Sequence, residues 1–429
     1  MNAIEKVYST FQKHRSICTD SRTVEPGAIF FALRGENFDG NRFIEVALEK
    51  GASLAITDSV ELKDKHNTVF VPNTLTFLQD LARYHRAKLS IPIIGLTGSN
   101  GKTTTKELIN QVLSSKFRTV ATRGNLNNHI GVPLTVISIL PDTEIAIVEM
   151  GANHIGEIAL LCSIAQPTHG LITNIGKAHL EGFGSFEGVK RGKSELYEFL
   201  ARNSGSGFIN GENPILHELA DAHGLTNLVY YGVNQFNLRQ VNSGSSFLSF
   251  NLSFKGKEYG ISTKLVGSYN IENILAAIII GHVFGVEVSD CISAIEGYVP
   301  TNNRSQIFKS QNNTIILDAY NANPSSMELA LRNFSDMETD LPKMVILGEM
   351  LELGEFSDSE HERIARLALD SFENIVLVGK NFAPMSSHAA WFPSQHELSV
   401  HLKESPIAGH TILMKGSRGV RLDEVVKFL

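Results

Sequence analysis

IIGLTGSNGKTTTKELI, residues 93–109, is the stretch from which the rest of the chain can be interpreted. It predicts a buried strand beginning at Ile93, then a glycine-rich turn, then a helix. Gly98 and Gly101 allow the backbone to close around an anion, and the helix start offers unpaired N–H groups at its positive end. Such a turn is typical of a phosphate-binding loop.

Two side chains of this turn fit a nucleoside triphosphate. Lys102 can reach phosphate oxygens as a point charge, and the Thr103 hydroxyl is placed to ligate a magnesium ion between the terminal phosphates. The spacing differs from the usual phosphate-loop pattern, which needs glycine where this chain has Leu96. The strand before the turn and the helix after it still favour a triphosphate site over an ordinary turn.

The composition bounds the class of protein. With 429 residues and 42% hydrophobic content, the chain is too long for one core, and three domains are expected. The net charge of -7, the isoelectric point near 6.1 and the lack of Lys/Arg-rich blocks argue against a nucleic-acid groove. Cys18, Cys162 and Cys291 lack metal-ligand spacing and are typical of reduced cytosolic thiols.

The sequence pattern also argues against membrane insertion. The N-terminus MNAIEKVYSTFQKHR is charged and amphipathic and lacks the apolar core of a signal peptide. The longest apolar run, residues 275–280, is too short to cross a bilayer. We therefore expect a soluble protein of the cytoplasm.

Alternating strand and helix patterns predict an α/β fold with three domains. Residues 1–90 are expected to form a small α/β N-terminal domain, residues 91–301 a central P-loop domain with a parallel sheet, and residues 302–429 a Rossmann-like C-terminal domain. Strands are expected at 28–33, 53–57 and 69–71 in the first, at 118–122, 144–150, 170–174, 207–210 and 228–231 in the second, and at 314–318, 344–347, 375–378 and 411–414 in the third.

The strict alternation of SFLSFNLSF, residues 246–254, predicts a half-exposed antiparallel strand appended to the central sheet. Helices are expected from Asn41, over 74–88, from Pro324, over 359–372 and at the C-terminus. The carboxyl ends of the parallel strands should carry the ligands.

Three residues of the expected central domain are candidates for chemistry. Glu149 ends an apolar strand, where an open α/β sheet presents a magnesium ligand to a bound triphosphate, although a solvated strand end is the alternative. His179 lies in a glycine-rich loop, but a lone histidine is more often structural. Lys193 lies on a predicted helix, where lysine usually faces solvent. Glu149 is therefore the first acidic candidate.

Polar residues near the second domain boundary are further candidates. Asn270 and Asn273 share one face of an apolar helix, where they can bond a purine edge or merely cap the helix. Arg304 could swing toward a phosphate on closure or form a salt bridge between domains. Asp318 follows a strand, with the amides of Asn321 and Asn323 shortly after it.

The N-terminal domain has paired polar and basic residues beside its first strands. Ser21 and Arg22 belong to CTDSR, and Arg34 belongs to FALRG. These side chains could hold an anionic or nucleotide-like ligand, or they could cap turns.

Several segments, taken in chain order, resemble the Mur ligase family of ATP-dependent amide-forming enzymes. They are DSRTVEPGAIFFALRGENFDG (20–40), TGSNGKTTTKE (97–107), GNLNNHIGVPLT (124–135), VEMGANHIGEI (148–158), ITNIGKAHLEGFGS (172–185), DAYNANPSSM (318–327), LGEMLELGEFS (347–357) and KGSRGVRLDEVV (415–426). The family loop TG-[ST]-x-GKT-[ST] also accounts for Leu96. The resemblance covers essentially the whole chain.

Within the family, the chain is most similar to the branch that joins D-alanyl-D-alanine to a UDP-N-acetylmuramoyl-tripeptide. The branch that adds diaminopimelate carries a DNPR signature in its last domain, which this chain lacks. The resemblance implies that ATP activates the tripeptide carboxylate as an acyl phosphate, which the dipeptide amine then attacks. It also implies a cytoplasmic enzyme of peptidoglycan synthesis, and we expect it to be a monomer.

The resemblance assigns roles to residues at matching positions. Lys102, His179 and Lys193 become catalytic, with Thr103 and Glu149 on one magnesium ion, His179 on a second, and Lys193 carbamylated to help hold magnesium. The ATP loop is Gly98, Ser99, Asn100, Gly101, Lys102, Thr103 and Thr104. Asn270 and Asn273 fall near adenine, and Arg304 and Asp318 fall on ATP contacts between domains. The substrate positions are Ser21, Arg22 and Arg34 for the uridine diphosphate, Asn125, Asn127 and Asn128 for the muramoyl peptide, and Asn321 and Asn323.

Two alternatives remain open from the sequence. A folylpolyglutamate-type ligase shares the loop and the final domains but has no obvious use for the N-terminal domain. A nucleotide switch of the guanine type would need an NKxD segment, which the chain lacks. The sequence also leaves open whether the third residue of the peptide is diaminopimelate or lysine.

Overall fold

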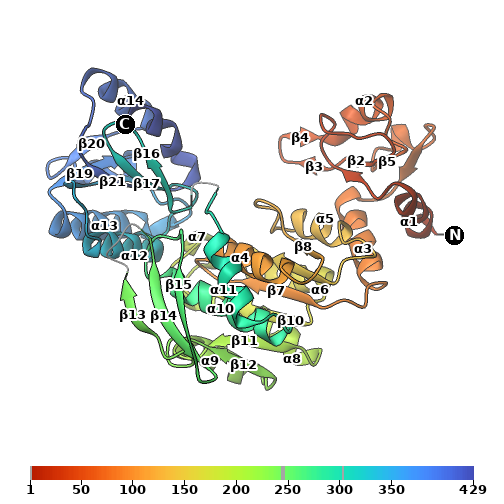
Figure 1. The fold of residues 1–429 in the computed structure, drawn as a ribbon. Helices are drawn as coiled ribbons and strands as arrows, with labels where there is room; N and C mark the ends of the chain where they lie inside the picture. The colour runs from red at the N-terminus through yellow and green to blue at the C-terminus, as the bar shows by residue number, and fades with distance from the viewer. Residues whose placement is uncertain (1, 243–246, 302–303) are drawn as a thin grey trace.

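The computed structural model describes residues 2–242, 247–301 and 304–429, and Figure 1 shows its three α/β parts. The start of the expected strand at Ser246 and the hinge residues 302–303 lie outside the described residues. Each part is built around a mainly parallel sheet, so the predicted fold class is confirmed. In Figure 1 the N-terminal and C-terminal parts lie on opposite sides of the view, above the central part.

The N-terminal part contains a sheet in the order β1-β2-β5-β6, in which all strands are parallel. Phe30 and Phe31 of β2 enter different core clusters, because successive side chains of a strand point to opposite faces. The elements are α1 (Ala3–His14), β1 (Ile17–Cys18), β2 (Ile29–Phe31), β3 (Arg34–Gly35), β4 (Phe38–Asp39), η1 (Gly40–Phe43), α2 (Ile44–Glu49), β5 (Leu54–Thr57), η2 (Val60–Leu62), β6 (Thr68–Phe70) and α3 (Thr74–Arg86).

Helix α3 joins this part to the central part. On one side, the Nδ1 atom of His85 lies 3.0 Å from the hydroxyl of Tyr8 in α1. On the other side, the Nε2 atom of His85 lies 2.9 Å from the carbonyl oxygen of Ile139, and Arg86 donates to the carbonyl of Ala165 at 3.0 Å. The same helix therefore belongs to the packing of both parts.

The central sheet has the strand order β12-β11-β10-β7-β9-β8, with all strands parallel. Every residue of β7 is buried, as expected for a parallel strand covered on both faces. The elements are β7 (Ile93–Thr97), α4 (Lys102–Ser114), β8 (Thr119–Ala121), α5 (Gly131–Ile137), β9 (Ile145–Glu149), α6 (Glu157–Ala165), β10 (His169–Ile172), α7 (Leu180–Phe183), α8 (Phe186–Arg202), β11 (Ser206–Asn210), α9 (Pro214–Ala222), β12 (Leu228–Tyr231), β13 (Arg239–Asn242), β14 (Ser249–Phe254), β15 (Lys257–Ser262), α10 (Asn270–Val283) and α11 (Val288–Gly297).

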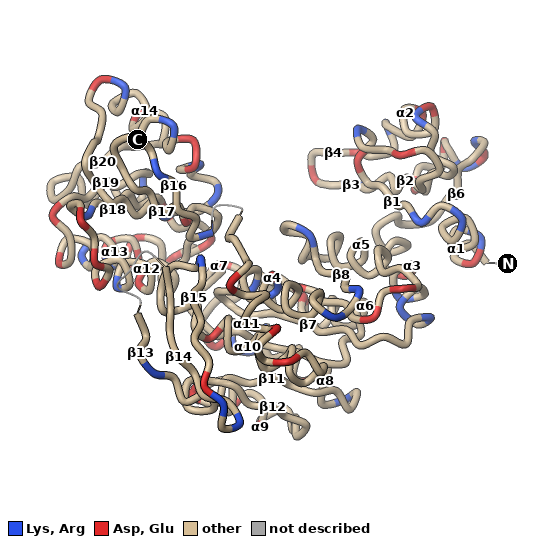
Figure 2. Tube along the Cα trace, in the orientation of Figure 1, with Lys and Arg blue, Asp and Glu red and all other residues tan. Residues whose placement is uncertain are grey.

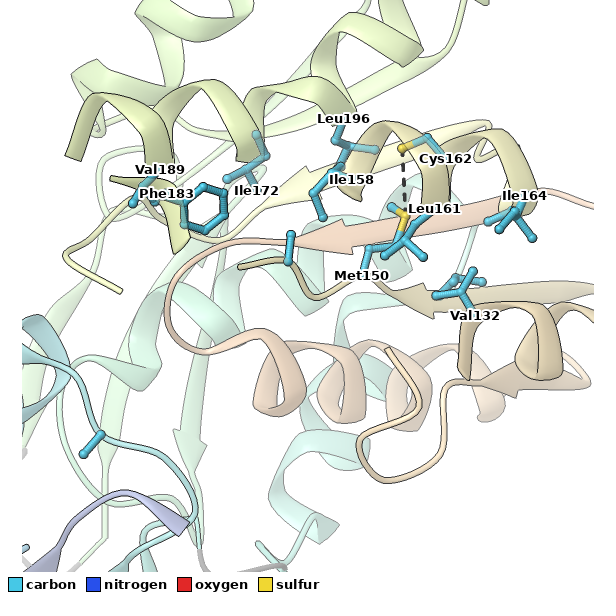
Figure 3. Close-up of a cluster of buried hydrophobic side chains, with 14 of the residues drawn as sticks. Val132, Met150, Ile158, Leu161, Cys162, Ile164, Ile172, Phe183, Val189 and Leu196 are labelled. Carbon is cyan, nitrogen blue, oxygen red and sulfur yellow. Dashed lines mark hydrogen bonds between the residues drawn. The ribbon is translucent and has the colours of Figure 1, made fainter. Parts of the chain in front are cut away.

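Helices cover both faces of the central sheet. Helices α4, α10 and α11 share a core on one face that includes Ile109 and Ile278. Helices α5, α6 and α8 contribute to the core on the other face, where Figure 3 shows Leu161 of α6 beside Met150 and the Sγ atom of Cys162 lies 3.9 Å from the Sδ atom of Met150. Each fully buried Leu, Ile or Met side chain stabilises the fold by about 1.5–3 kcal/mol. The two helix layers therefore hold the sheet between them.

The strand expected at 246–254 belongs to a different sheet. Strand β14 pairs antiparallel with β13 and β15 in a separate sheet, so the prediction that it extends the central sheet is wrong. Phe250, Leu252 and Phe254 are buried in the core that contains α10 and α11. The alternation determines which face of the strand is buried but not its neighbour, and here the apolar face packs on helices rather than continuing a sheet edge.

The C-terminal sheet has the order β16-β17-β21-β18-β19-β20 and is parallel except for the β16-β17 pair. The prediction of a final α-helix is wrong. Two 3-10 helices take its place, separated by Arg421, whose φ of 58° interrupts an α-helix. The elements are β16 (Gln306–Lys309), β17 (Thr314–Asp318), α12 (Pro324–Asp336), β18 (Lys343–Gly348), η3 (Gly354–Phe356), α13 (Ser357–Ser371), β19 (Asn374–Val378), η4 (Lys380–Met385), β20 (Ala390–Phe392), α14 (Gln395–Glu404), β21 (Thr411–Lys415), η5 (Arg418–Val420) and η6 (Leu422–Phe428).

Charged residues of both signs are mixed along all three parts of the chain, as Figure 2 shows. Many pair locally, such as Arg366 with Glu362 one helical turn away at 2.6 Å, and each such exposed pair contributes only a few tenths of a kcal/mol. Within the described residues, no helix is long and apolar enough to cross a membrane.

Candidate active site

The loop between β7 and α4 has the backbone that the sequence predicts. Gly98 has φ 141°, and a Cβ atom there would lie 2.0 Å from the hydroxyl oxygen of Thr173. Gly101 has φ 77° and is the N-cap of α4, where no side chain of the described residues caps the helix. The N–H groups at the start of this 13-residue helix are therefore free to bind an anion.

We expect Gly98→Ala to destroy nucleotide binding, because the added methyl group collides with Thr173 and the residue must also adopt a positive φ. Calorimetric titration with MgATP should show an affinity loss of at least about 100-fold, corresponding to about 3 kcal/mol. Gly224→Ala is the matched control, because Gly224 has φ 66° but no atom within 4 Å of an added Cβ. Equal nucleotide affinity in the two variants would contradict the prediction.

Lys102 folds back over its own loop. Its ammonium group donates to the carbonyls of Gly98 at 2.7 Å and Ser99 at 3.1 Å. Burial lowers the pKa of Lys102 to about 8, with Glu149 opposing this shift and Arg304 adding to it. A bound phosphate would stabilise the charged form and raise this pKa again, so the lysine is placed to respond to an anion in the loop.

Glu149 and Thr103 lie together beside the loop. Strands β7 and β9 are neighbours with Leu96 opposite Glu149, which brings this carboxylate to the sheet edge where the loop begins. The Thr103 hydroxyl lies 2.9 Å and 3.1 Å from the two carboxylate oxygens, and the amide of Asn127 donates to one of them at 2.8 Å. A hydroxyl and a carboxylate in contact form an oxygen donor set of the kind that magnesium uses.

The two other expected metal ligands, His179 and Lys193, have hydrogen-bond partners other than Glu149 and Thr103. His179 starts α7 with φ 53°, and its Nδ1 atom forms a short contact with Glu352 of the C-terminal part, whose pKa this hydrogen bond lowers. Lys193 of α8 is fully buried and donates to the carbonyl of Ala152 at 2.8 Å. Among the described residues, no three His, Cys, Asp or Glu side chains form a ready metal cluster.

Lys193 has an unusual environment for a lysine. Burial, together with the positive charge of Lys102, holds the pKa of its ammonium group well below the ordinary value. Its Nζ atom lies 5.0 Å from the ring centre of Phe183. The acidic Glu195, two residues along the helix, is bound to the N–H groups of Gly156 at 2.5 Å and Ala159 at 2.8 Å. The amine of Lys193 is therefore biased toward its neutral, nucleophilic form.

Asn270 and Asn273 lie at the start of α10, against the loop. The amide of Asn273 donates to the side-chain oxygen of Asn270 at 2.9 Å and accepts from the Thr105 hydroxyl at 2.9 Å. Asn270 donates to the carbonyl of Val266 at 2.8 Å. These hydrogen bonds hold Asn273 directly against Gly101. A Cβ atom added to Gly101 would lie 2.8 Å from the side-chain oxygen of Asn273.

The C-terminal part closes the other side of the site. The guanidinium carbon of Arg304 lies 4.0 Å from the ring centre of Tyr320, and among the described residues its buried Nε atom has no hydrogen-bond partner. Lys415 donates to Asp318 at 2.5 Å. The unpaired Nε atom is a donor available to a ligand, since buried donors are normally satisfied.

Asn321 and Asn323 have different surroundings. The backbone carbonyl of Asn321 accepts from Lys415 at 3.5 Å, whereas the side chain of Asn323 donates across the domain boundary to Asn100 of the loop at 2.8 Å. Asn323 also caps α12 through Ser326. The loop and the start of α12 are thus in direct contact.

A single cavity of about 990 Å³ connects these groups. It extends from the loop, past Glu149 and the start of α10, to Asp318 and Lys415 of the C-terminal part. Its size is at the upper end of the range for small-molecule and cofactor sites. The expected residues that line it are Ser99, Asn100, Gly101, Lys102, Thr103, Thr104, Asn127, Asn128, Glu149, His179, Asn270, Asn273, Arg304, Asp318, Asn321 and Asn323.

The candidates that do not line the cavity are Gly98, Lys193, Ser21, Arg22, Arg34 and Asn125, although Lys193 donates to the carbonyl of Ala152, which does line it. Arg22 is exposed and paired with Asp20 at 2.7 Å, and Arg34 is bound to Asp58 at 2.8 Å. The carbonyl of Ser21 accepts from a lysine at 2.9 Å. Asn125 is exposed, whereas Asn128, three residues later, lines the cavity and accepts from the N–H of Gly131, the first residue of α5, at 2.9 Å.

Sequence reasoning missed Lys415 and Glu352. Lys415 ends the apolar strand β21, so the same strand-end argument that selected Glu149 could have found it. Glu352 has no comparable signal, because its contact with His179 joins residues that are 173 positions apart.

The chain matches known proteins over nearly its full length. Residues 13–86 match the catalytic domain of the Mur ligase family, residues 96–281 the Mur ligase middle domain, and residues 303–418 the Mur ligase glutamate ligase domain. It is 36% identical to the UDP-N-acetylmuramoyl-tripeptide–D-alanyl-D-alanine ligase of Bacillus subtilis, covering 96% of this chain and 92% of that protein.

Two solved structures are similar in fold and length. A crystal structure of MurF from Acinetobacter baumannii is 29% identical with a TM-score of 0.85, covering 96% of this chain and 92% of that one. The MurF ligase of Thermotoga maritima, solved in complex with ADP, is 25% identical with a TM-score of 0.83, covering 100% and 98% of the two chains.

Proposed function

The chain belongs to the Mur ligase family, and we propose that it joins D-alanyl-D-alanine to UDP-N-acetylmuramoyl-tripeptide at the expense of ATP in peptidoglycan precursor synthesis. The observation that carries the proposal is the continuous cavity, which joins the phosphate loop and Glu149 to the C-terminal part. A ligase of this kind must hold ATP, an acid and an amine in one enclosed space. ADP and phosphate are the other products.

The reaction that we propose has two steps. An oxygen of the tripeptide carboxylate attacks the γ-phosphorus, the bond to ADP breaks, and an acyl phosphate forms. The free amine of D-alanyl-D-alanine then attacks the acyl carbon, phosphate leaves, and the amine loses a proton. In this proposal Lys102 and the loop N–H groups stabilise the negative charge that develops on the transferred phosphoryl group, and their place at the start of α4 supports this role.

Magnesium is part of this proposal. Thr103 and Glu149 fit one ion, because they form a paired hydroxyl and carboxylate next to the phosphate loop. His179 would contribute to a second, together with Lys193 after carbamylation, in which the neutral amine adds CO2 and releases a proton to become a carbamate. Magnesium neutralises charge on the phosphates of bound ATP. The buried, weakly basic amine of Lys193 supports this modification.

The other assignments are proposals of the same kind. We propose that the amides of Asn270 and Asn273 bind near the adenine and that Arg304 and Asp318 bind the nucleotide from the C-terminal part, and the shared cavity that all four residues line supports this. Ser21, Arg22 and Arg34 hold the uridine diphosphate, Asn125, Asn127 and Asn128 the muramoyl peptide, and Asn321 and Asn323 the incoming dipeptide. We place the domain boundaries after residues 90 and 301, and we propose a cytoplasmic monomer, because one chain provides all three binding regions.

The test is release of ADP by the purified full chain across combinations of substrates. We expect release only when a UDP-N-acetylmuramoyl-tripeptide and D-alanyl-D-alanine are both present, with diaminopimelate and lysine versions of the tripeptide compared side by side. Release with a folate and glutamate instead would support a folylpolyglutamate-type ligase. Release that ignores both substrates would support a nucleotide switch. Either of these two outcomes would overturn the proposal.

A further inference from the structure

Lys177 lies where the central part meets the C-terminal part, two residues before His179. Its backbone N–H donates to the hydroxyl of Ser325 at 3.0 Å, and its ammonium group donates to Glu360 of α13 at 2.6 Å. The preceding Gly176 is also close, because an added Cβ there would lie 3.0 Å from the Ser325 hydroxyl oxygen. This segment therefore fits closely against the start of α12 and against α13.

Glu360 is a buried carboxylate with two different partners. One oxygen accepts from Lys177 across the domain boundary, and the other accepts from Arg363 of the same helix at 2.7 Å. Arg363 also donates to Glu328 of α12 at 2.7 Å. Burial would raise the pKa of Glu360, but the hydrogen bonds from Lys177 and Arg363 hold it below its ordinary value. Glu360 is therefore ready to accept a cation from the central part.

We propose that Lys177 and Glu360 form a reversible latch that holds the C-terminal part closed over the phosphate loop. Lys177 is then a positioning residue for the ligase reaction, and its catalytic consequence rests on the proposed function. At the same boundary, the side chain of Asn323 donates to Asn100 of the loop at 2.8 Å. The latch stabilises the alignment of these groups without touching either substrate.

The two halves of the latch differ in a way that makes it reversible. The side chain of Lys177 is 48% exposed, so water can solvate its charge when the parts separate. The side chain of Glu360 is only 8% exposed, but it keeps Arg363 as a partner after separation. Breaking a buried ion pair is usually costly because one charge stays buried without a partner. Here neither charge is left in that state when the parts separate. The latch can therefore bias closure without locking the enzyme shut.

The first test compares Lys177→Met with the wild-type enzyme. Because a partly exposed ion pair contributes at most about 1 kcal/mol, we expect KM for D-alanyl-D-alanine to rise about three- to five-fold, with kcat within about two-fold. Lys190→Met is the matched control, because Lys190 of α8 pairs with Glu218 at 2.9 Å inside the central part. Lys177→Arg keeps the positive charge, so we expect its KM for D-alanyl-D-alanine to stay close to the wild-type value. Equal KM values for Lys177→Met, Lys190→Met and wild type would overturn the proposal.

A double-mutant cycle tests the pair itself. Glu360→Gln preserves the shape of the side chain but removes its charge, and we expect Lys177→Met and Glu360→Gln to have the same effect on KM singly and together. Thermal unfolding of each variant shows whether Glu360→Gln, which weakens the contact with Arg363, disturbs folding. If the fold increases in KM of the two single variants multiply in the double variant, the two residues act independently. That result would reject the latch.

Solution X-ray scattering of the ligand-free full chain provides a readout that does not depend on catalysis. We expect a larger radius of gyration for Lys177→Met than for wild type, and no change for Lys190→Met. If the ADP-release assay fails with every substrate while scattering shows this opening, the proposed function is wrong and the latch stands. If catalysis is as proposed and scattering is unchanged by Lys177→Met, the latch is wrong.

Discussion

Lys102→Ala is expected to abolish measurable turnover while leaving the fold intact. The ammonium group lies over the loop, bonded to the carbonyls of Gly98 and Ser99, where it can move onto a phosphate oxygen. Removing one positioned group that stabilises transition-state charge typically costs about 10²–10³ in kcat, and Lys102 acts on the phosphoryl group itself. ADP release measured with both substrates at saturation, and thermal unfolding measured alongside it, separate lost chemistry from lost folding.

The control for this prediction is Lys116→Ala. Lys116 follows the end of α4 and donates to the carbonyl of Gly285 at 2.5 Å, far along the helix from the loop. It should retain near-wild-type activity. A Lys102→Ala enzyme that turns over at a rate close to wild type would remove the assigned role of this lysine.

Lys193→Ala should also be severely impaired, but for a different reason. If the buried amine is carbamylated, the substitution removes a carboxylate rather than a cation, and a short carboxylic acid such as acetate can occupy the vacated space. We expect kcat to fall about 100-fold, the upper end of the range seen when groups that support a metal are lost, and to recover partly on adding acetate. Lys190→Ala, one turn earlier on α8, should show neither the loss nor the recovery.

A spectroscopic measurement tests the modification without relying on activity. Wild-type protein equilibrated with ¹³C-labelled bicarbonate should give a carbamate carbon signal in NMR spectra, and Lys193→Ala should lack it. A wild-type spectrum without this signal, or activity of Lys193→Ala near the wild-type rate, would refute carbamylation as the role of Lys193.

Local sequence rules predicted the backbone of the glycine-rich loop and its place beside Glu149. The strand, turn and helix around Gly98 follow from apolar periodicity and from the backbone freedom of glycine, both of which are local properties. Glu149 could be found because parallel strands end at the same edge of a sheet, and the structure places it against Thr103. Neither step requires knowledge of distant contacts.

The parts that the sequence did not reveal depend on pairs distant in the chain. Lys177 and Glu360 are 183 positions apart, and each alone looks like an ordinary surface charge. The apolar alternation of β14 correctly predicts a strand with one buried face, but the identity of its neighbours depends on how the chain returns through β13 and β15. Such choices are decided by packing rather than by local preference.

The shared helix α3 has a practical consequence for dissecting the chain. Leu78 and Leu81 of this helix are buried in the same core cluster as Val136 of α5, so cutting the chain at the linker near residue 90 would bare an apolar strip on the catalytic core. A fragment beginning there would tend to aggregate during expression. A shortened enzyme for screening or crystallisation should instead begin before Asn73, which caps α3. It would then keep this helix packed over the apolar residues of the central part.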